Sequence, residues 1–163
     1  MRIALCPVHA SDGPRLAELR AVAMRESLER VGRFDELRVR QRLLDGFAPQ
    51  WTRHVVDSGL EVGFVVVRPD PSLAAPPTPP ASGSAAPAPQ HALLDHLYIA
   101  PAHQGKGLGA AVLALVFAEA DALRQRLRVG ALKHSAANRF YLRHGFSPCG
   151  EGEWDAYYER WPA

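Results

Sequence analysis

The most informative segment of the chain reads Leu97-Tyr98-Ile99-Ala100-Pro101-Ala102-His103-Gln104-Gly105-Lys106-Gly107-Leu108-Gly109-Ala110. Its glycines alternate with other residues, between an apolar run typical of a strand and an apolar pattern typical of a helix. Glycine lets the backbone approach a ligand closely, and the first N–H groups of the helix stay free to point into the turn. Because the helix dipole and Lys106 both add positive charge, the turn predicts a cradle for a phosphate or pyrophosphate.

The spacing of the glycines narrows the choice of phosphate ligand. A P-loop of the Walker A type needs Ser or Thr after its Gly-Lys pair, and here Gly107 follows Lys106. The dinucleotide fingerprint GxGxxA fits Gly105, Gly107 and Ala110, but the next expected strand, Leu127–Leu132, lacks the acidic residue that binds the ribose. The dinucleotide interpretation and a glycine-rich turn without any ligand therefore stay open as alternatives.

Hydrophobic periodicity and turn residues predict the remaining elements. We expect strands at 2–6, 52–56, 60–68, 92–99, 127–132, 146–149 and 154–160. We expect helices beginning near Pro14 and spanning 34–47, 108–124 and 136–144. This order predicts an α+β fold in which a mixed sheet carries helices on both faces.

Composition and charge limit the classes of function. The 163 residues are 47% hydrophobic and carry a formal net charge of +2, with no long run of one sign. Binding to nucleic acid or to a membrane surface through bulk charge is therefore disfavoured. No stretch has the length of a membrane span, and the apolar start is too short for a signal peptide, so we expect a cytoplasmic protein. We expect Cys6 and Cys149 to be free thiols, and we expect no metal site.

One segment stands apart in composition. Eight of the fourteen prolines lie between Pro69 and Pro89, among Ala, Ser and Gly. Such a segment favours an extended and mobile loop. Because the halves that it separates are each marginal as independent cores, we expect one domain over residues 1–163 with a Pro/Ala-rich flexible insertion at about 69–91.

Two motifs resemble those of the GNAT superfamily of N-acetyltransferases. The turn Gln104-x-x-Gly107-x-Gly109, between a strand and an amphipathic helix, is similar to that superfamily's coenzyme A pyrophosphate loop. A later segment, which follows a strand, is similar to its Asn-containing helix and aromatic-Tyr-x-x-x-Gly-Phe ending: Ala137-Asn138-Arg139-Phe140-Tyr141-Leu142-Arg143-His144-Gly145-Phe146. The likeness covers essentially the whole chain apart from the Pro-rich segment.

The resemblance implies a GNAT-like acyl-CoA N-acyltransferase fold, with elements in the order βααβββαβαββ and a mixed, mostly antiparallel sheet. It implies that the strand Leu93–Ile99 splays away from Leu127–Leu132 and opens a wedge for the pantetheine arm and thioester of acetyl-CoA. Backbone N–H groups near Leu97 and Ile99 would bind the thioester carbonyl and its developing oxyanion. The implied coenzyme contacts come from Leu97, Tyr98, Ile99, Gln104, Gly105, Lys106, Gly107, Leu108, Gly109, Ala110, Asn138, Phe140, Tyr141 and Arg143, with Arg139 as an alternative to Arg143 for the 3′-phosphate.

The resemblance also implies catalytic roles. Tyr141 matches the family's tyrosine, and a phenol, which stays protonated at neutral pH, can give a proton to the leaving thiolate. Asp95 and His96 lie on the strand beside the wedge, where a base must take a proton from an ammonium substrate. Because adjacent strand residues face opposite sides, we expect only one of the two to serve. His96 has the suitable pKa, and Asp95 would act through a water or bind the ammonium.

The implied activity is direct transfer of an acetyl group from acetyl-CoA to a primary amine, on a small molecule or a protein, without a covalent enzyme intermediate. The alternative is a coenzyme A-binding sensor or interaction module without turnover, and the resemblance allows a homodimer. Acidic side chains are expected to face a cationic amine and aromatic ones to wall the pocket. The candidates are Glu26, Asp35, Glu36 and Glu153, and Phe34, Trp51, Trp154 and Tyr157.

Overall fold

The computed structural model describes residues 1–73 and 91–163. Its strands and helices are β1 (Ile3–Pro7), α1 (Gly13–Arg30), α2 (Glu36–Asp45), β2 (Thr52–Asp57), β3 (Leu60–Pro69), β4 (His91–Ile99), α3 (Leu108–Ala122), β5 (Arg126–Leu132), α4 (Ala136–Arg143), β6 (Ser147–Glu151) and β7 (Asp155–Arg160). The order βααβββαβαββ confirms the order that we expect from the sequence.

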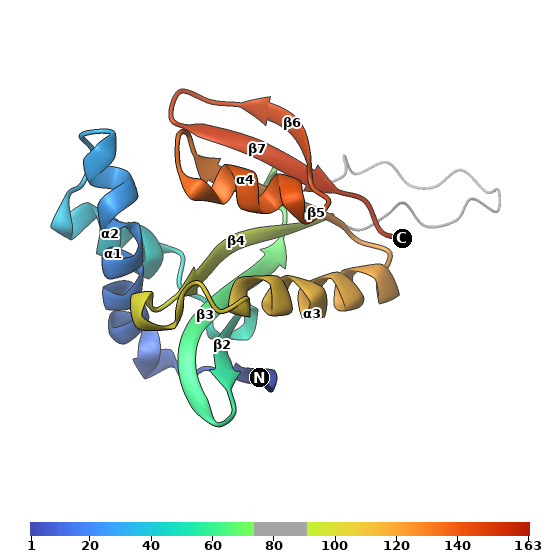
Figure 1. Cartoon of the computed structure of the whole chain (residues 1–163), viewed down its shortest axis with the longest axis horizontal. Coiled ribbons are helices and arrows are strands. Elements are labelled where there is room, and N and C mark those ends of the chain that lie inside the picture. Colours follow the sequence, from blue (N-terminus) through green and yellow to red (C-terminus); the bar gives the residue numbers. More distant parts are fainter. Residues whose placement is uncertain (74–90) are drawn as a thin grey trace.

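All seven strands form one sheet, in the order β1-β2-β3-β4-β5-β7-β6. Neighbouring strands are antiparallel except β4 and β5, which are parallel, so α3 must carry the chain back to the start of β5. Figure 1 shows α1 and α2 on one side of the central strands and α3 on the other. The expected mixed, mostly antiparallel sheet is therefore confirmed.

The two faces of the sheet carry separate hydrophobic cores. Val65 of β3 packs in the core that α3 covers, which includes Val112. Its neighbours Phe64 and Val66 point to the opposite face and join the core of α1 and α2. Because side chains alternate along a strand, a strand that is covered on both faces must be apolar throughout, which explains the unbroken apolar run of β3.

Glycine is required at one point where β3 meets β4. A Cβ built on Gly63 would lie 2.1 Å from the carbonyl oxygen of Tyr98, which is far inside van der Waals contact. Gly63 pairs with Ile99. One residue further along, the Ala100 N–H donates to the Val62 carbonyl at 2.8 Å. The close approach of these two strands therefore fixes the position of the chain that enters the glycine-rich turn.

The end of α3 differs slightly from the expected boundary. The sequence predicts a helix to Arg124, whereas α3 ends at Ala122. Arg124 has a left-handed backbone with φ 52°, and the Gln125 N–H donates to the Ala120 carbonyl at 2.7 Å. This bond closes the helix in the manner of a Schellman motif and turns the chain into β5.

The Pro-rich segment lies in a hairpin connection. Pro69 belongs to β3, His91 begins β4, and the Asp70 N–H donates to the His91 carbonyl at 3.1 Å. Residues 74–90, on which the expectation of a flexible insertion rests, lie outside the described residues.

Cys6 on β1 and Cys149 on β6 are both free thiols, at opposite edges of the sheet. Within the two described ranges, no helix has the length and apolar character of a membrane span.

Candidate active site

The parallel strands β4 and β5 separate along their length. They pair only where His91–Leu94 runs beside Arg126–Val129. Beyond that point β4 stays paired with β3 as far as Ile99, and β5 stays paired with β7 as far as Leu132. The facing edges of β4 and β5 therefore diverge into a wedge, which confirms the splay that the family resemblance implies.

A β-bulge lies on β4 where the wedge opens. Val66 of β3 pairs with His96, and the next residue, Val67, pairs with Leu94, so Asp95 is an extra residue in β4. A bulge breaks the alternation of side chains along a strand. Asp95 and His96 consequently line the same cavity, with 3.7 Å between His96 Nε2 and Asp95 Oδ2. The premise that these adjacent residues face opposite sides is therefore wrong, whereas the expectation that only one of them serves stays a prediction.

Asp95 and His96 have different electrostatic surroundings. Asp95 forms an ion pair with Arg68, with 2.8 Å between Oδ2 and Nη2. The pKa of His96 is lowered to about 4, mainly because the ring is buried between Phe64 and Tyr98. The charge of Asp95 opposes this shift, and the charges of Arg20, Arg42 and Arg68 contribute to it. His96 is therefore neutral at physiological pH and a weak base, which favours Asp95 as the group that receives an ammonium.

The glycine-rich turn has the geometry of an anion cradle. Gly105 and Gly107 adopt left-handed backbones with φ 74° and 77°, a conformation in which other residues are strained. The Gln104 side chain donates to the Ile99 carbonyl at 2.8 Å and so ties the turn back to β4. No side chain caps the N-terminus of α3, and the turn is exposed. The first N–H groups of α3, from Leu108 onward, are thus available to a ligand.

The other residues of the turn have distinct local roles. The Lys106 ammonium donates to the Ala102 carbonyl at 3.2 Å, which holds its charge over the turn. Leu108 is buried in the core, so only its backbone can meet a coenzyme. A Cβ built on Gly109 would lie 3.1 Å from Phe140 Cζ, so this glycine lets α3 approach α4. Phe140 therefore acts on the turn through packing.

Tyr141 lies in the core below the wedge. Its ring contacts Phe140 and Phe146, each with ring centroids 5.4 Å away, and it is 7% exposed. Burial raises the pKa of its phenol above the usual value, with a smaller contribution from Tyr98. In the described part of the chain, its hydroxyl has no hydrogen-bond partner. The phenol therefore stays protonated and keeps its donor available, while its raised pKa makes it a weaker acid than an exposed tyrosine.

Asn138 is already engaged inside the protein. Its Nδ2 donates to the Leu132 carbonyl at 2.9 Å and to the Ser135 carbonyl at 3.0 Å, and its Oδ1 accepts from the Tyr158 hydroxyl at 2.7 Å. These bonds fix the start of α4 against the end of β5 and against Tyr158 within β7. Its expected contact with the pantetheine arm stays a prediction. Arg143 and Arg139 are both exposed on α4, and their expected phosphate contact stays a prediction too.

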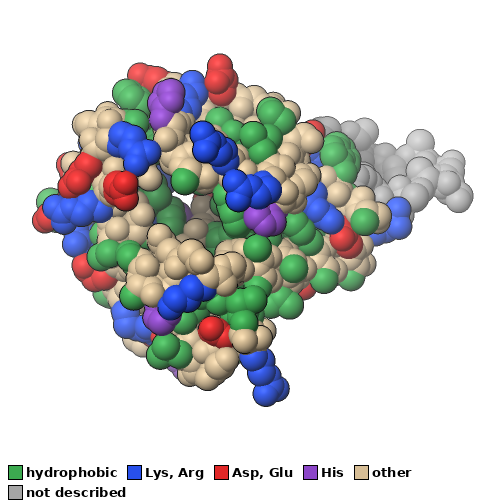
Figure 2. Space-filling view, in the orientation of Figure 1, with side chains coloured by type: hydrophobic (Ala, Val, Ile, Leu, Met, Phe, Trp, Pro, Cys, Tyr) green, Lys and Arg blue, Asp and Glu red, His purple; other side chains and the backbone are tan. Residues whose placement is uncertain are grey.

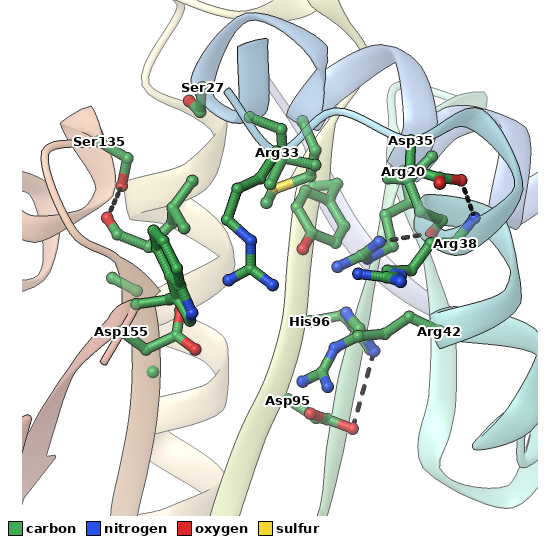
Figure 3. Close-up of a pocket in the computed structure, with 18 residues that line it drawn as sticks. Arg20, Ser27, Arg33, Asp35, Arg38, Arg42, Asp95, His96, Ser135 and Asp155 are labelled. Atoms are coloured by element: carbon green, nitrogen blue, oxygen red, sulfur yellow. Dashed lines mark hydrogen bonds and ion pairs between the residues drawn. The ribbon is translucent and has the colours of Figure 1, made fainter. Parts of the chain in front are cut away.

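A cavity of about 410 Å³ opens on the α1/α2 side of the wedge. Figure 2 shows this face hollowed, with basic side chains at its border. In Figure 3 the wall of α1 and α2, with Arg20 and Arg42, faces the wall that carries Ser135 and Asp155. Of the expected acidic and aromatic lining, Asp35 and Trp154 are present, whereas Glu26, Glu36, Glu153, Phe34, Trp51 and Tyr157 are not part of it.

Sequence reasoning missed the four arginines of this cavity, which are Arg20, Arg33, Arg38 and Arg42. The one local signal is the spacing of Arg38 and Arg42, which places both on one face of α2. Across the described residues, no group of three His, Cys, Asp or Glu side chains is arranged to hold a metal ion.

Comparisons with known proteins agree with this geometry. Residues 51–148 match the family model of the acetyltransferase (GNAT) domain. No curated protein shows a significant sequence match to the chain. Many solved structures share the fold. An acetyltransferase from Thermus thermophilus is 22% identical with a TM-score of 0.70, covering 98% of this chain and 97% of that one.

Two further structures share the fold at lower identity. The PaiA N-acetyltransferase from Thermoplasma acidophilum, solved in complex with coenzyme A, is 13% identical with a TM-score of 0.71 and 99% coverage of both chains. A GNAT-family acetyltransferase from Listeria monocytogenes is 15% identical with a TM-score of 0.61, covering 98% of this chain and 94% of that one. The match of the family model to more than half of the chain shows that it belongs to the GNAT acetyltransferase family.

Proposed function

We propose that this chain is an acetyl-CoA-dependent N-acetyltransferase that transfers the acetyl group directly to a primary amine. The observation that carries the proposal is the position of the uncapped N-terminus of α3, which directly follows the strand that splays from β5. A helix N-terminus favours phosphate, and a splayed strand leaves backbone N–H groups unpaired. The Thermoplasma relative was crystallised with coenzyme A, which supports the same ligand for this chain.

Several groups of the chain would hold the coenzyme. The N–H groups of the turn from Gln104 to Ala110 would bind the pyrophosphate, and those of β4 near Leu97 and Ile99 would bind the pantetheine amides and the thioester carbonyl. Acetyl-CoA supplies an activated acetyl thioester. Backbone donors that already point at the carbonyl would stabilise the negative charge that develops there during attack.

Side chains beside the wedge would accept and donate the protons of the reaction. Asp95, held by Arg68, binds the ammonium form of the substrate and accepts its proton directly or through a water. The free amine nitrogen then attacks the acetyl carbon, and the bond from carbon to sulfur breaks. The leaving thiolate takes a proton from the Tyr141 hydroxyl, and the second proton that the nitrogen loses as the amide forms restores the phenol, directly or through water. The neutral state of His96 keeps a positive charge away from the approaching ammonium.

Ligand binding gives the first test of the proposal. Acetyl-CoA and coenzyme A are expected to raise the melting temperature of the protein, because a ligand that binds only the folded state stabilises it. NADH is expected to have no effect, and a rise with NADH alone would favour the dinucleotide interpretation instead. No rise with either coenzyme at millimolar concentration would contradict the proposal.

Replacement of Tyr141 by phenylalanine tests the enzymatic role. In Tyr141→Phe we expect the single-turnover rate of amine acetylation to fall about a hundredfold, with acetyl-CoA affinity unchanged, because only the proton donor is lost. Tyr157→Phe is the matched control, since Tyr157 packs beside Arg128 outside the cavity. Full activity in Tyr141→Phe would contradict the assignment of Tyr141 as the general acid. Coenzyme binding without any turnover in the unmodified protein would favour a non-catalytic sensor.

A further inference from the structure

The cavity beside the wedge has a basic wall. Four arginines and three aspartates line it, but two of the aspartates are already engaged. Asp35 accepts from the backbone N–H groups of Leu37 and Arg38 at 3.0 and 2.8 Å and thereby caps α2. Asp95 is paired with Arg68, which lies outside the lining. Asp35 keeps its negative charge in this role, but with Asp95 paired to Arg68 the four arginines of the lining face only the charges of Asp35 and Asp155, so positive charge is in excess.

The arginines retain unused hydrogen-bond donors. Arg42 forms no ion pair with any described residue, and Arg38 lies beside Asp35 without forming one. Arg20 is only 6% exposed, and although one of its Nη atoms donates to the Val39 carbonyl, its Nε is buried without a partner. The Nδ1 atom of the buried His96 is also unpartnered. A buried donor without an acceptor, such as Arg20 Nε, is unfavourable, which favours an acceptor group beside this wall.

The charges are also separated across the cavity. Asp155, on β7, has a side chain without a hydrogen bond or ion pair among the described residues, and it lies opposite Arg20 and Arg42 (Figure 3). Asp95 lies between these walls at the bulge of β4. A ligand that matches this arrangement has a positive end toward the aspartates and a negative end toward the arginines.

We propose that the acceptor is a small amine that also carries an anionic group, a carboxylate or a phosphate, and that Arg20, Arg38 and Arg42 bind this group. The inference rests on the proposed function and adds the class of its acceptor. Planar guanidinium groups bind both kinds of oxyanion with two parallel hydrogen bonds. A polyamine would meet repulsion from the same wall. No residue of the glycine-rich turn lines this cavity, so the arginines are distinct from the expected pyrophosphate contacts.

Matched pairs of acceptors test the preference. We would measure kcat/KM with acetyl-CoA for the common L-amino acids against their amides, and for O-phosphoethanolamine against ethanolamine, with spermidine as the cationic comparison. We expect at least about a tenfold advantage for the anionic member of one pair, and which pair shows it distinguishes a carboxylate from a phosphate. Preference for spermidine or for the uncharged amines would overturn the inference and leave the proposed function intact.

Replacement of one arginine tests the assigned group. Arg42 is exposed on α2, so Arg42→Gln is expected to fold, and Arg38→Gln provides a second variant. For the anionic acceptor we expect kcat/KM to fall at least about tenfold, mainly through KM, with little change for its uncharged partner or for acetyl-CoA. Arg30→Gln is the control, because Arg30 pairs with Glu26 on the outer surface of α1.

The outcomes separate the two proposals. An equal loss on charged and uncharged acceptors in Arg42→Gln would overturn the role of the arginines. If the same variant has a weaker affinity for acetyl-CoA and an unchanged acceptor preference, Arg42 binds the coenzyme instead. That result would also overturn the role of the arginines in acceptor binding. Acetyl-CoA binding without acetylation of any amine would contradict the proposed function, and the inference would fall with it.

Discussion

His96 shows how one buried side chain connects the chemistry of the site with the stability of the fold. Its imidazole is 7% exposed and packs against the rings of Phe64 and Tyr98. The lowered pKa of His96 means that the folded protein holds this group neutral, while Arg20 and Arg42 oppose its protonation. The arrangement that keeps this cavity, the proposed acceptor site, free of an imidazolium charge therefore makes folding dependent on pH.

The sign of this dependence follows from proton binding in the two states. The pKa of His96 is lowered from 6.5 to about 4, so between these pH values the unfolded chain binds a proton that the folded protein does not. Its contribution to stability is complete above pH 6.5 and is lost as the pH falls toward 4, by up to about 1.4 kcal/mol per pH unit. Urea unfolding of the protein and of His96→Gln at several pH values checks this. The variant should show the shallower slope, and parallel profiles would contradict the prediction.

Which site residues could be predicted from sequence depends on how local their signal is. The glycine-rich turn and Tyr141 belong to short motifs with characteristic spacing, so the resemblance could single them out as candidates. The shared cavity of Asp95 and His96 depends on a bulge against β3, and alternation along one strand cannot reveal a pairing with another. The basic wall depends on how α1 and α2 pack against the wedge, and an arginine on a helix is usually a solvated residue.

At the scale of elements, periodicity and turn residues predicted the bounds of the strands, of α2, α3 and α4, and the start of α1 within about two residues; the end of α1 at Arg30 was not predicted. The remaining shifts lie in terminal turns, where backbone closure such as the left-handed Arg124 decides the boundary. The splay of β4 from β5 was predicted from the family resemblance alone, because no pattern within either strand shows where their pairing stops. In the turn before α3, the same glycines, Gly105 and Gly107, allow the left-handed backbone and form part of the proposed pyrophosphate site.

Paired glycine substitutions separate these two roles of the turn. Gly107 and Gly32 both have positive φ, 77° and 69°, and a Cβ built on either meets no atom within 4 Å. Alanine at either position should therefore cost about 1–2 kcal/mol of folding free energy through backbone strain. Only Gly107→Ala adds a methyl group where the backbone would approach the pyrophosphate, and we expect its acetyl-CoA affinity to fall about tenfold. Calorimetric titration checks this, and equal coenzyme affinity in both variants would contradict the assignment of the turn.

For the whole molecule, the Pro-rich segment raises the question of whether the chain is one domain or two. The β3/β4 pairing joins the residues before the segment to those after it, and β4 continues into the pairing with β5. The core that α3 covers contains Val55 and Val65 from the first half and Leu113 and Leu127 from the second. Because neither half can bury this surface alone, we propose that the chain unfolds as one cooperative unit.

Shortening the connection tests that proposal. Pro69 pairs with Ala92, so the two ends of the connection meet at the close of an antiparallel ladder, and a linker of about four Gly and Ser residues in place of 74–90 can join them. Loop-closure entropy changes by only about 0.6 kcal/mol for each halving of loop length, so the variant should be more stable by about 1 kcal/mol, or a few degrees in Tm. We expect a single calorimetric transition. We also expect an unchanged acetyl-CoA affinity, because the whole of β4 (His91–Ile99) separates the replaced residues from the glycine-rich turn along the chain. Two separate transitions, in the variant or in the unmodified protein, would show that the halves fold independently. A large loss of stability would show that the segment packs against the domain.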